Sequence, residues 1–343
     1  MNKLQYKFSG KTTTYYLDAD FSYLEKLVDK DHTVLVTDEH LFSAQQKRFG
    51  GWNTIVINAG EQYKVQATVD SIIAQLIELG ADRKTTLVGV GGGVVTDITG
   101  YVAAIFMRGL GFGFVPTSIL AMVDAAIGGK NGIDVDVFKN MVGTIRQPQF
   151  LLYDYDLLRS LPKEEWVNGF AEIIKHAAIR DAALFRELAK NKLSTYQRDK
   201  ALLAKLIRRN VVIKSDVVEK DEFEQGERRL LNFGHTLGHA IENVYELSHG
   251  QAVSIGMVAA CMISEEFTPF KETDRVIDVL KRYGLPTLAE FDPKEVMDVL
   301  RMDKKKVKDS MNYVMLNKIG QGVVRAIPLT ELEKLLQSII TAR

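Results

Sequence analysis

The sequence has little cysteine, no net charge and no long apolar run. Cys261 is the one cysteine among 343 residues, which excludes an internal disulfide. The 44 basic and 44 acidic residues cancel, so no field of one sign favours nucleic acid or an acidic membrane. No apolar stretch approaches the ~18 residues of a membrane span, and the N-terminus lacks the apolar core of a secretion signal. We therefore expect a cytoplasmic protein that holds any anionic ligand by a local cluster of cations.

The length and the order of elements predict two domains of different character. A chain of 343 residues exceeds the usual size of a single core. From Thr33 to Thr117, short β-branched runs alternate with helical segments, which predicts a parallel sheet with helices on both faces. After about Leu161, helical segments follow one another. We expect an α/β protein with a Rossmann-like parallel-sheet domain at 1–160 and a mainly α-helical domain at 161–343.

Hydrophobic periodicity and turn residues set the expected bounds of the elements. Strands are predicted at 33–37, 54–57, 85–90 and 111–115, and helices at 65–79, 94–107, 162–179, 182–190, 199–219, 235–246, 253–267 and 273–283. A small β element is expected at 311–316 and 323–327.

Gly91, Gly92 and Gly93 stand between a predicted strand and a predicted helix. Glycines in this position let backbone N–H groups approach a pyrophosphate at the helix N-terminus. Thr96 occupies the sixth position of the G-x-G-x-x-G fingerprint, so a plain tight turn is the alternative. Asp38, at the end of an earlier strand, is placed to accept a hydrogen bond from a ribose hydroxyl, or else to cap the next helix.

A second glycine-rich stretch, Val123–Gly132, carries Asp124 and Lys130 and is followed by Lys139 and Asn140. We expect a flexible loop whose cations suit an anionic ligand. Arg108, just after the helix that follows the first glycine turn, could add a bidentate phosphate contact. Ordinary solvated charges are the alternative.

Three of the six histidines lie between residues 235 and 249. His235 and His239 are four residues apart on a predicted helix, so they share one face. His249 is a candidate third metal ligand, and Glu172 can complete a site of two histidines and one carboxylate that leaves one coordination position of the metal open. The pair lacks the Glu of His-Glu-x-x-His, which argues against a metalloprotease. A polar helix face, and a surface ion pair between Glu172 and Lys175, are the plain alternatives.

Together these motifs resemble the 3-dehydroquinate synthase family, within the sugar phosphate cyclase group. The matching stretches occur in the family's order over about residues 30–320. They are Gly91–Asp97, Met107–Gly109, Val115–Ser118, Val123–Asp124 with Gly128–Lys130, Lys139–Asn140, Ala171–Lys175, Leu231–Ala240 and His249–Gly250.

The resemblance implies NAD bound to the first domain, zinc or cobalt bound to the second, an active site in the cleft between them, and a homodimer. The implied metal ligands are Glu172, His235 and His249. The implied cofactor contacts are Asp38, Glu61, Lys64, Gly91, Gly92, Gly93, Val95, Asp97, Thr117, Ser118, Lys130 and Lys139. The implied substrate and catalytic residues are Arg108, Asp124, Lys130, Asn140, Lys175, Lys214, Arg228, Asn232 and His239, with Lys304 or Lys305 closing over the site.

The family's reaction converts the sugar acid phosphate 3-deoxy-D-arabino-heptulosonate 7-phosphate (DAHP) to 3-dehydroquinate and phosphate, in the shikimate pathway. The resemblance implies transient oxidation by NAD, elimination of phosphate, re-reduction and an aldol closure. Two stretches depart from the family pattern: Thr96 stands where a Gly is usual, and 133–138 lacks the usual Pro and Gly. The second departure borders the expected substrate pocket.

Three alternatives stay open at this point. The chain could be another sugar phosphate cyclase, acting on a sedoheptulose or glucose phosphate. It could be a polyol or glycerol phosphate dehydrogenase of similar architecture, which would release NADH. It could also be a catalytically silent metal- or nucleotide-binding module.

Overall fold

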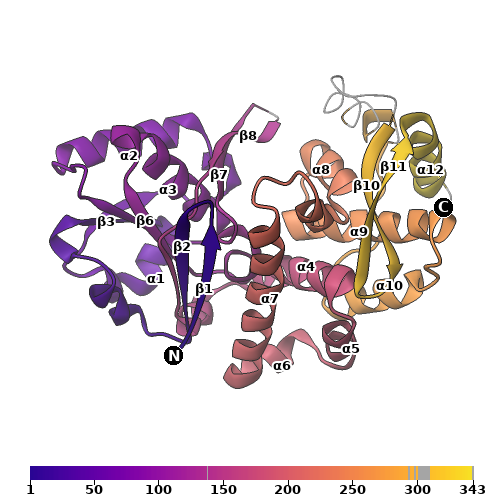
Figure 1. Cartoon of the computed structure of the whole chain (residues 1–343), viewed down its shortest axis with the longest axis horizontal. Helices are drawn as coiled ribbons and strands as arrows, with labels where there is room; N and C mark the ends of the chain where they lie inside the picture. The colour runs from indigo at the N-terminus through magenta and orange to yellow at the C-terminus, as the bar shows by residue number, and fades with distance from the viewer. Residues whose placement is uncertain (137, 293, 297–298, 300–309, 342–343) are drawn as a thin grey trace. The chain divides into compact units, whose positions relative to one another are not determined.

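The computed structural model describes residues 1–136, 138–292, 294–296, 299 and 310–341 (Figure 1). Unit 1 comprises Met1–Trp166 and Lys200–Phe223, and unit 2 comprises Val167–Asp199 and Glu224–Arg343. The segment Lys200–Phe223, which the sequence assigned to the second domain, is thus part of unit 1. The division of the chain into two domains at 160 and 161 stays a prediction.

Unit 1 is built on a seven-stranded sheet with the strand order β1-β2-β9-β6-β5-β3-β4. Its strands are β1 (Asn2–Phe8), β2 (Lys11–Leu17), β3 (Thr33–Asp38), β4 (Asn53–Ile57), β5 (Thr86–Gly91), β6 (Gly111–Pro116) and β9 (Phe150–Tyr153). All neighbouring strands run parallel except β1 and β2, which form an antiparallel hairpin. The predicted α/β class with a parallel N-terminal sheet is confirmed. The strands β1, β2 and β9 were not predicted.

Helices pack against this sheet because alternate residues of its strands point to opposite faces. Val88 and Val90 of β5 share a core with Leu41 and Phe49 of helix α1 (Glu39–Phe49). Gly89 points to the other face, where a Cβ would lie 2.9 Å from Oγ1 of Thr99 on α3 (Gly93–Ile105). Helix α2 (Gln66–Glu78) packs beside α3 and β4. The carboxyl ends of the parallel strands are thereby fixed against the helix N-termini that follow them.

The segment expected to be a flexible glycine-rich loop leads into an antiparallel hairpin. Gly128 and Gly129 form a turn with φ of 99° and 72°, and β7 (Lys130–Val135) then pairs with β8 (Phe138–Ile145). Ile133 is buried opposite Val142, so β-branched pairing decides the local structure. The loop predicted at Val123–Gly132 is thus confirmed for the turn at Gly128 and Gly129, and was wrong where the π-helical turn Ala121–Ala125 and β7 form regular structure.

Helix α7 (Lys200–Lys220) packs within unit 1 against β1 and the π-helical turn η5 (Ala121–Ala125). Ser215 donates a hydrogen bond of 3.2 Å to the Tyr15 hydroxyl, and the Lys7 amide donates to Glu219. The remaining short helical turns are η1 (Phe21–Lys26), η2 (Lys30–His32), η3 (Glu61–Tyr63), η4 (Phe106–Arg108), η6 (Tyr155–Ser160) and η7 (Glu227–Asn232).

Unit 2 is mainly helical, as predicted. It contains most of α4 (Lys163–Arg180), then α5 (Ala182–Lys190), α6 (Leu193–Arg198), α8 (His235–Val244), α9 (His249–Phe267), α10 (Thr273–Arg282) and α12 (Leu329–Thr341), with the hairpin β10 (Ser310–Lys318) and β11 (Gln321–Pro328). The largely buried α9 packs against α8, α10, α12 and β10 (Figure 1). In the parts of the chain that the structure describes, every helix is too short or too polar to span a membrane.

The start of α9 differs from the prediction. The helix begins at His249 rather than Val253, because the Ser248 hydroxyl accepts from the Gln251 amide and the Gln251 side chain accepts from the Ser248 amide. This reciprocal capping box satisfies two backbone donors at the helix N-terminus. His249 is therefore the first residue of a buried helix, and its backbone position is set by the cap.

Candidate metal centre and nucleotide-binding turn

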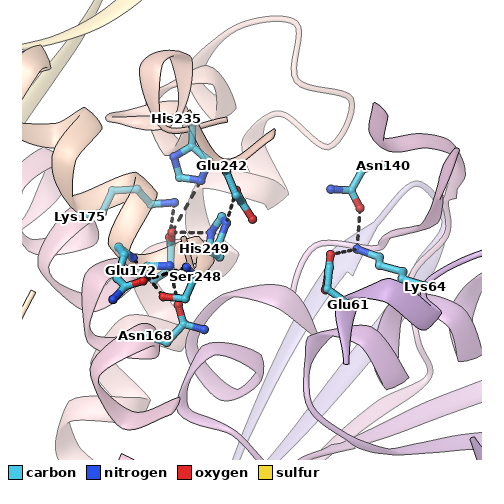
Figure 2. Close-up of polar contacts among 12 residues, drawn as sticks. Glu61, Lys64, Asn140, Asn168, Glu172, Lys175, His235, Glu242, Ser248 and His249 are labelled. Carbon is cyan, nitrogen blue, oxygen red and sulfur yellow. Dashed lines mark hydrogen bonds and ion pairs between the residues drawn. The ribbon is translucent and has the colours of Figure 1, made fainter. Parts of the chain in front are cut away.

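Three side chains from separate helices of unit 2 gather into one group. Glu172 comes from α4, His235 from the start of α8 and His249 from the start of α9 (Figure 2). Oε1 of Glu172 lies 3.3 Å from Nε2 of His249 and 3.6 Å from Nε2 of His235. One ligand atom from each residue lies within 4.8 Å of the other two. We predicted these three residues from the sequence as one metal site, and the fold brings them together.

The spacing of these atoms fits a tetrahedral metal ion. Zinc bonds of about 2.0–2.2 Å separate neighbouring ligand atoms by roughly 3.3–3.6 Å. The two distances from Glu172 lie in that range. The Glu172 side chain is fully buried, where a carboxylate requires a counter-charge; the Lys175 ammonium supplies one at Oε2, and Oε1 faces the imidazoles. The donor set of two imidazoles and one carboxylate is one that zinc or cobalt accepts.

The two imidazoles differ in charge when no metal is bound. Burial, and after it the Lys175 ammonium, holds the pKa of His235 well below its usual range, so this ring is neutral. Burial also opposes charge on His249, but hydrogen bonds to Glu172 and Glu242 outweigh it and raise its pKa to about 10. Nδ1 of His249 lies 3.4 Å from Oε2 of Glu242. A metal at this group would therefore displace a proton from His249.

Glu172 and Lys175 form an ion pair that is buried, in contrast to the surface pair weighed as an alternative. Their side chains are 0% and 2% exposed, and Nζ of Lys175 contacts Oε2 of Glu172. The pair leaves the other carboxylate oxygen, Oε1, directed at the two imidazoles. The Gly250 amide donates to Oδ1 of Asn168, which stands one helical turn before Glu172, and this contact joins the start of α9 to α4.

The other predicted substrate residues of unit 2 differ from one another in exposure and in their contacts. Arg228 in η7 is 2% exposed, and Asn232 donates through Nδ2 to Oε1 of Glu224. His239 is exposed, with its ring centroid 5.0 Å from that of His235. Lys304 and Lys305 lie outside the described residues.

In unit 1, the glycine turn joins β5 to α3 as predicted, and Gly92 is the N-cap of the helix. A Cβ on Gly91 would lie 2.5 Å from Cβ of Val95, so only glycine fits there. The Thr117 amide donates to the Gly91 carbonyl, and Ser118 follows at the end of β6. Thr96, the departure from the family pattern, is buried and donates through its hydroxyl to the Gly93 carbonyl. The turn offers the backbone amides of a helix N-terminus to an anion.

Lys64 lies at the centre of a second polar cluster in unit 1 (Figure 2). Its Nζ is 2.6 Å from Oδ2 of Asp97, 2.6 Å from Oδ1 of Asn140 and 3.7 Å from Oε1 of Glu61. The Asn140 amide in turn donates to Asp134. Three residues predicted as cofactor or substrate contacts thus surround a fourth, Lys64, and Asp134 is an addition that the sequence did not indicate.

The remaining predicted residues of unit 1 lie on other elements. Asp38 caps α1 by accepting from the Leu41 amide at 2.9 Å, which is the alternative weighed for it. Lys214 of α7 pairs with Asp124 of η5 at 2.8 Å. Arg108, which ends η4 with φ of 66°, and Lys130 at the start of β7 are exposed, and Lys139 in β8 is partly exposed.

Sequence interpretation missed two residues around the metal group, Glu242 and Asn168. Glu242 stands seven residues after His235 on the same helix, and that spacing places both on one face. This signal was available in the sequence. The contact of Asn168 with Gly250 joins distant segments, so no local pattern could have indicated it.

The fold defines the class of protein. The structure of ValA, a 2-epi-5-epi-valiolone synthase from Streptomyces hygroscopicus with NAD+ and Zn2+ bound, aligns with a TM-score of 0.87. The alignment covers 98% of each chain at 26% identity. The chain therefore has the architecture of a sugar phosphate cyclase.

The sequence comparisons identify the family. Models of the N-terminal and C-terminal parts of 3-dehydroquinate synthase match residues 54–168 and 169–306. The 3-dehydroquinate synthase of Acetivibrio thermocellus is 38% identical over 341 residues, which cover 94% of this chain and 95% of that one. The enzyme of Pyrococcus abyssi is 42% identical over 278 residues, covering 80% and 81%. The chain belongs to the 3-dehydroquinate synthase family, as its motifs predicted.

Proposed function

We propose that the chain is a 3-dehydroquinate synthase, a phosphate-eliminating lyase that converts DAHP to 3-dehydroquinate and inorganic phosphate in the shikimate pathway. The observation that carries the proposal is the 38% sequence identity between the chain and a 3-dehydroquinate synthase, over 94% of the chain. The group of Glu172, His235 and His249 supports it independently, because it provides the donor set that a metal-dependent member of this family requires.

The proposal includes NAD and one divalent metal ion, zinc or cobalt. When bound, NAD would accept and return a hydride, and the metal would polarise a substrate oxygen as a Lewis acid. The presence of NAD+ and Zn2+ in ValA supports this assignment. Glu172, His235 and His249 would hold the metal. The backbone amides after Gly91 would face the pyrophosphate of NAD. The further cofactor contacts would be Asp38, Glu61, Lys64, Asp97, Thr117 and Ser118.

The predicted substrate residues would bind the anionic groups of the substrate. Arg228 is a buried guanidinium, the side chain best suited to bidentate contact with a carboxylate or phosphate. Lys175 is buried beside Glu172, so it would present its charge at the metal group. Asn232 and His239 would hydrogen-bond to substrate oxygens and orient the reacting carbons. In unit 1, Arg108, Asn140, Lys130 and Lys214 would complete the contacts.

Inorganic phosphate release from DAHP tests the proposal. We expect release that requires both supplied NAD and divalent metal, is abolished by chelator and is restored by Zn2+ or Co2+. Sedoheptulose 7-phosphate and glucose 6-phosphate serve as control substrates, and faster turnover of either would assign the chain to another cyclase. NADH absorbance should not grow in proportion to product, because the cofactor is regenerated. Stoichiometric NADH would instead indicate a dehydrogenase.

A cytoplasmic location and a homodimer belong to the same proposal. The homodimer rests on the family resemblance. Cell fractionation tests the location, and sedimentation equilibrium of the purified protein tests the dimer.

A further inference from the structure

Glu242 is a buried carboxylate beside the metal group. It lies on the face of α8 that also carries His235 and His239, because residues separated by four and seven positions share one side of a helix. Its side chain is 5% exposed. Burying a carboxylate is costly without a hydrogen-bonding partner, so its contacts indicate what holds it there.

The contact of Glu242 that bears on the metal group is with Nδ1 of His249, at 3.4 Å (Figure 2). The other ring nitrogen, Nε2, lies 3.3 Å from Oε1 of Glu172. His249 therefore stands between two carboxylates, one on each nitrogen. Because a neutral imidazole carries a single N–H, a proton on Nδ1 that is donated to Glu242 leaves the Nε2 lone pair free for a metal.

His235 has the same arrangement with a different acceptor. Its Nε2 lies 3.6 Å from Oε1 of Glu172, and its Nδ1 lies 3.2 Å from the Phe233 carbonyl oxygen. In both rings Nε2 lies near Oε1 of Glu172, and Nδ1 lies near a second oxygen atom on the other side of the ring. The oxygen near Nδ1 of His235 is the Phe233 carbonyl, and the oxygen near Nδ1 of His249 belongs to the Glu242 carboxylate. A carboxylate acceptor raises the basicity of the ligand more than a carbonyl does.

We propose that Glu242 is the positioning residue for His249: it accepts the Nδ1–H hydrogen bond, fixes the ring orientation and selects the tautomer whose Nε2 binds the metal. The inference rests on the proposed metal site formed by Glu172, His235 and His249. It extends that site by a group that touches neither the metal nor the substrate. Metal affinity should therefore depend on Glu242 although the number of bound ions does not.

A competing assignment makes Glu242 a metal ligand. Ligand atoms of His239, Glu242 and His249 also lie within 4.8 Å of one another, so this trio could hold an ion of its own. We favour the positioning role, because Nδ1 of His249 cannot donate to Glu242 and bind a second metal at the same time. The number of ions bound per chain separates the two assignments.

The test measures binding of Co2+ alone to metal-stripped full-length protein, with a competing chelator and visible absorption as readouts. We expect Glu242→Ala to weaken Co2+ binding by about 10- to 100-fold, with one ion bound at saturation. Glu242→Gln keeps the side-chain volume and an acceptor oxygen, so it should recover part of the loss. Glu246→Ala, at an exposed glutamate just after α8, is the matched control and should bind Co2+ as the wild type does.

Nitrogen-15 NMR of labelled histidine in the zinc-loaded protein adds a readout that a purely structural role would not change. The wild type should show a protonated Nδ1 and a metal-bound Nε2 for His249, and Glu242→Ala should lose this fixed pattern. Co2+ affinity of Glu242→Ala within twofold of the wild type would overturn the inference. So would a fall from two bound ions to one. A wild type that binds no divalent metal would instead overturn the proposed metal site itself.

Discussion

Nζ of Lys64 lies 2.6 Å from Oδ2 of Asp97, so two side chains predicted separately as cofactor contacts form one ion pair. Their side chains are 5% and 17% exposed. Burial disfavours the charged ammonium, but the carboxylates of Asp97 and Glu61 outweigh it and raise the pKa of Lys64 above its usual value. Lys64 therefore stays protonated, and the neighbouring carboxylates balance its charge.

Asp97→Asn should destabilise unit 1 and weaken NAD binding. Removing one member of a nearly buried pair leaves the other charge poorly compensated, and Asn140 and Glu61 offset only part of this. We expect a loss of about 1–3 kcal/mol in the free energy of unfolding, measured with urea, together with a higher Kd for NAD. Glu61→Gln is the control: Glu61 is 46% exposed and 3.7 Å from Nζ, so its loss should stay below about 1 kcal/mol. Equal losses of unfolding free energy in the two variants would contradict this account.

His235→Ala should abolish turnover by removing a metal ligand. The ring supplies one of the three donor atoms around the proposed ion, and alanine leaves Glu172 and His249 alone. We expect substoichiometric metal after dialysis, measured by atomic emission, and a rate of phosphate release at least ~10²-fold lower. His32→Ala, at an exposed histidine of unit 1, should retain both metal and rate. Full metal content with a near-normal rate in His235→Ala would refute the ligand assignment.

Local patterns predicted the elements that carry the site. The glycine turn between β5 and α3 followed from Gly91–Gly93 after a β-branched run, and the shared face of His235 and His239 followed from their spacing. Glu172 and His249 were proposed as partners from their residue types, the family motifs pointed to the same two residues, and the structure places them beside His235. These predictions depend on short-range geometry, which a sequence expresses directly.

Contacts between distant segments could not be predicted in the same way. The i,i+3 spacing of Glu172 and Lys175 is the same for a surface pair and for the buried pair observed, and only the surrounding helices decide between them. The β7–β8 hairpin depends on pairing Ile133 with Val142 across the turn, which outweighs the preference of its glycines for a loop. The start of α9 is a different case, because Ser248 and Gln251 form a recognisable capping box that the prediction overlooked.

Gly250→Ala should destabilise unit 2. A Cβ at this position would lie 2.6 Å from Oδ1 and 2.8 Å from Cα of Asn168, so α9 would have to move away from α4. We expect a loss of about 1–3 kcal/mol in the free energy of unfolding and weaker Co2+ binding, since His249 moves with the helix. At Gly50 the nearest atom would be 3.4 Å away, and Gly50→Ala should change stability by less than about 0.5 kcal/mol. Unchanged stability of Gly250→Ala would show that the contact with Asn168 is readily relaxed.

Arg108→Ala should weaken substrate binding through the phosphate group. Arg108 is exposed at the end of η4, so its loss should leave the fold intact, and a charge-assisted contact is worth about 1.5–3 kcal/mol. We therefore expect the KM for DAHP to rise roughly 10- to 100-fold, with a smaller change in kcat. Arg83→Ala removes an exposed arginine outside the predicted site and should leave KM unchanged. An unchanged KM in Arg108→Ala would remove this residue from the phosphate site.

Metal binding should release about one proton near neutral pH and should weaken as the pH falls. Without metal, hydrogen bonds to Glu172 and Glu242 outweigh burial and raise the pKa of His249 to about 10, so below that pH its ring is protonated. Proton and metal compete for Nε2, and the Kd for Co2+ should rise about tenfold for each unit by which the pH drops below 10. His235 adds no proton in this range, because its pKa lies well below the usual value. Calorimetric titrations with Co2+ in two buffers of different ionisation enthalpy measure the proton count directly. A Kd that is independent of pH between about 7 and 9 would show that His249 is already neutral before the metal binds.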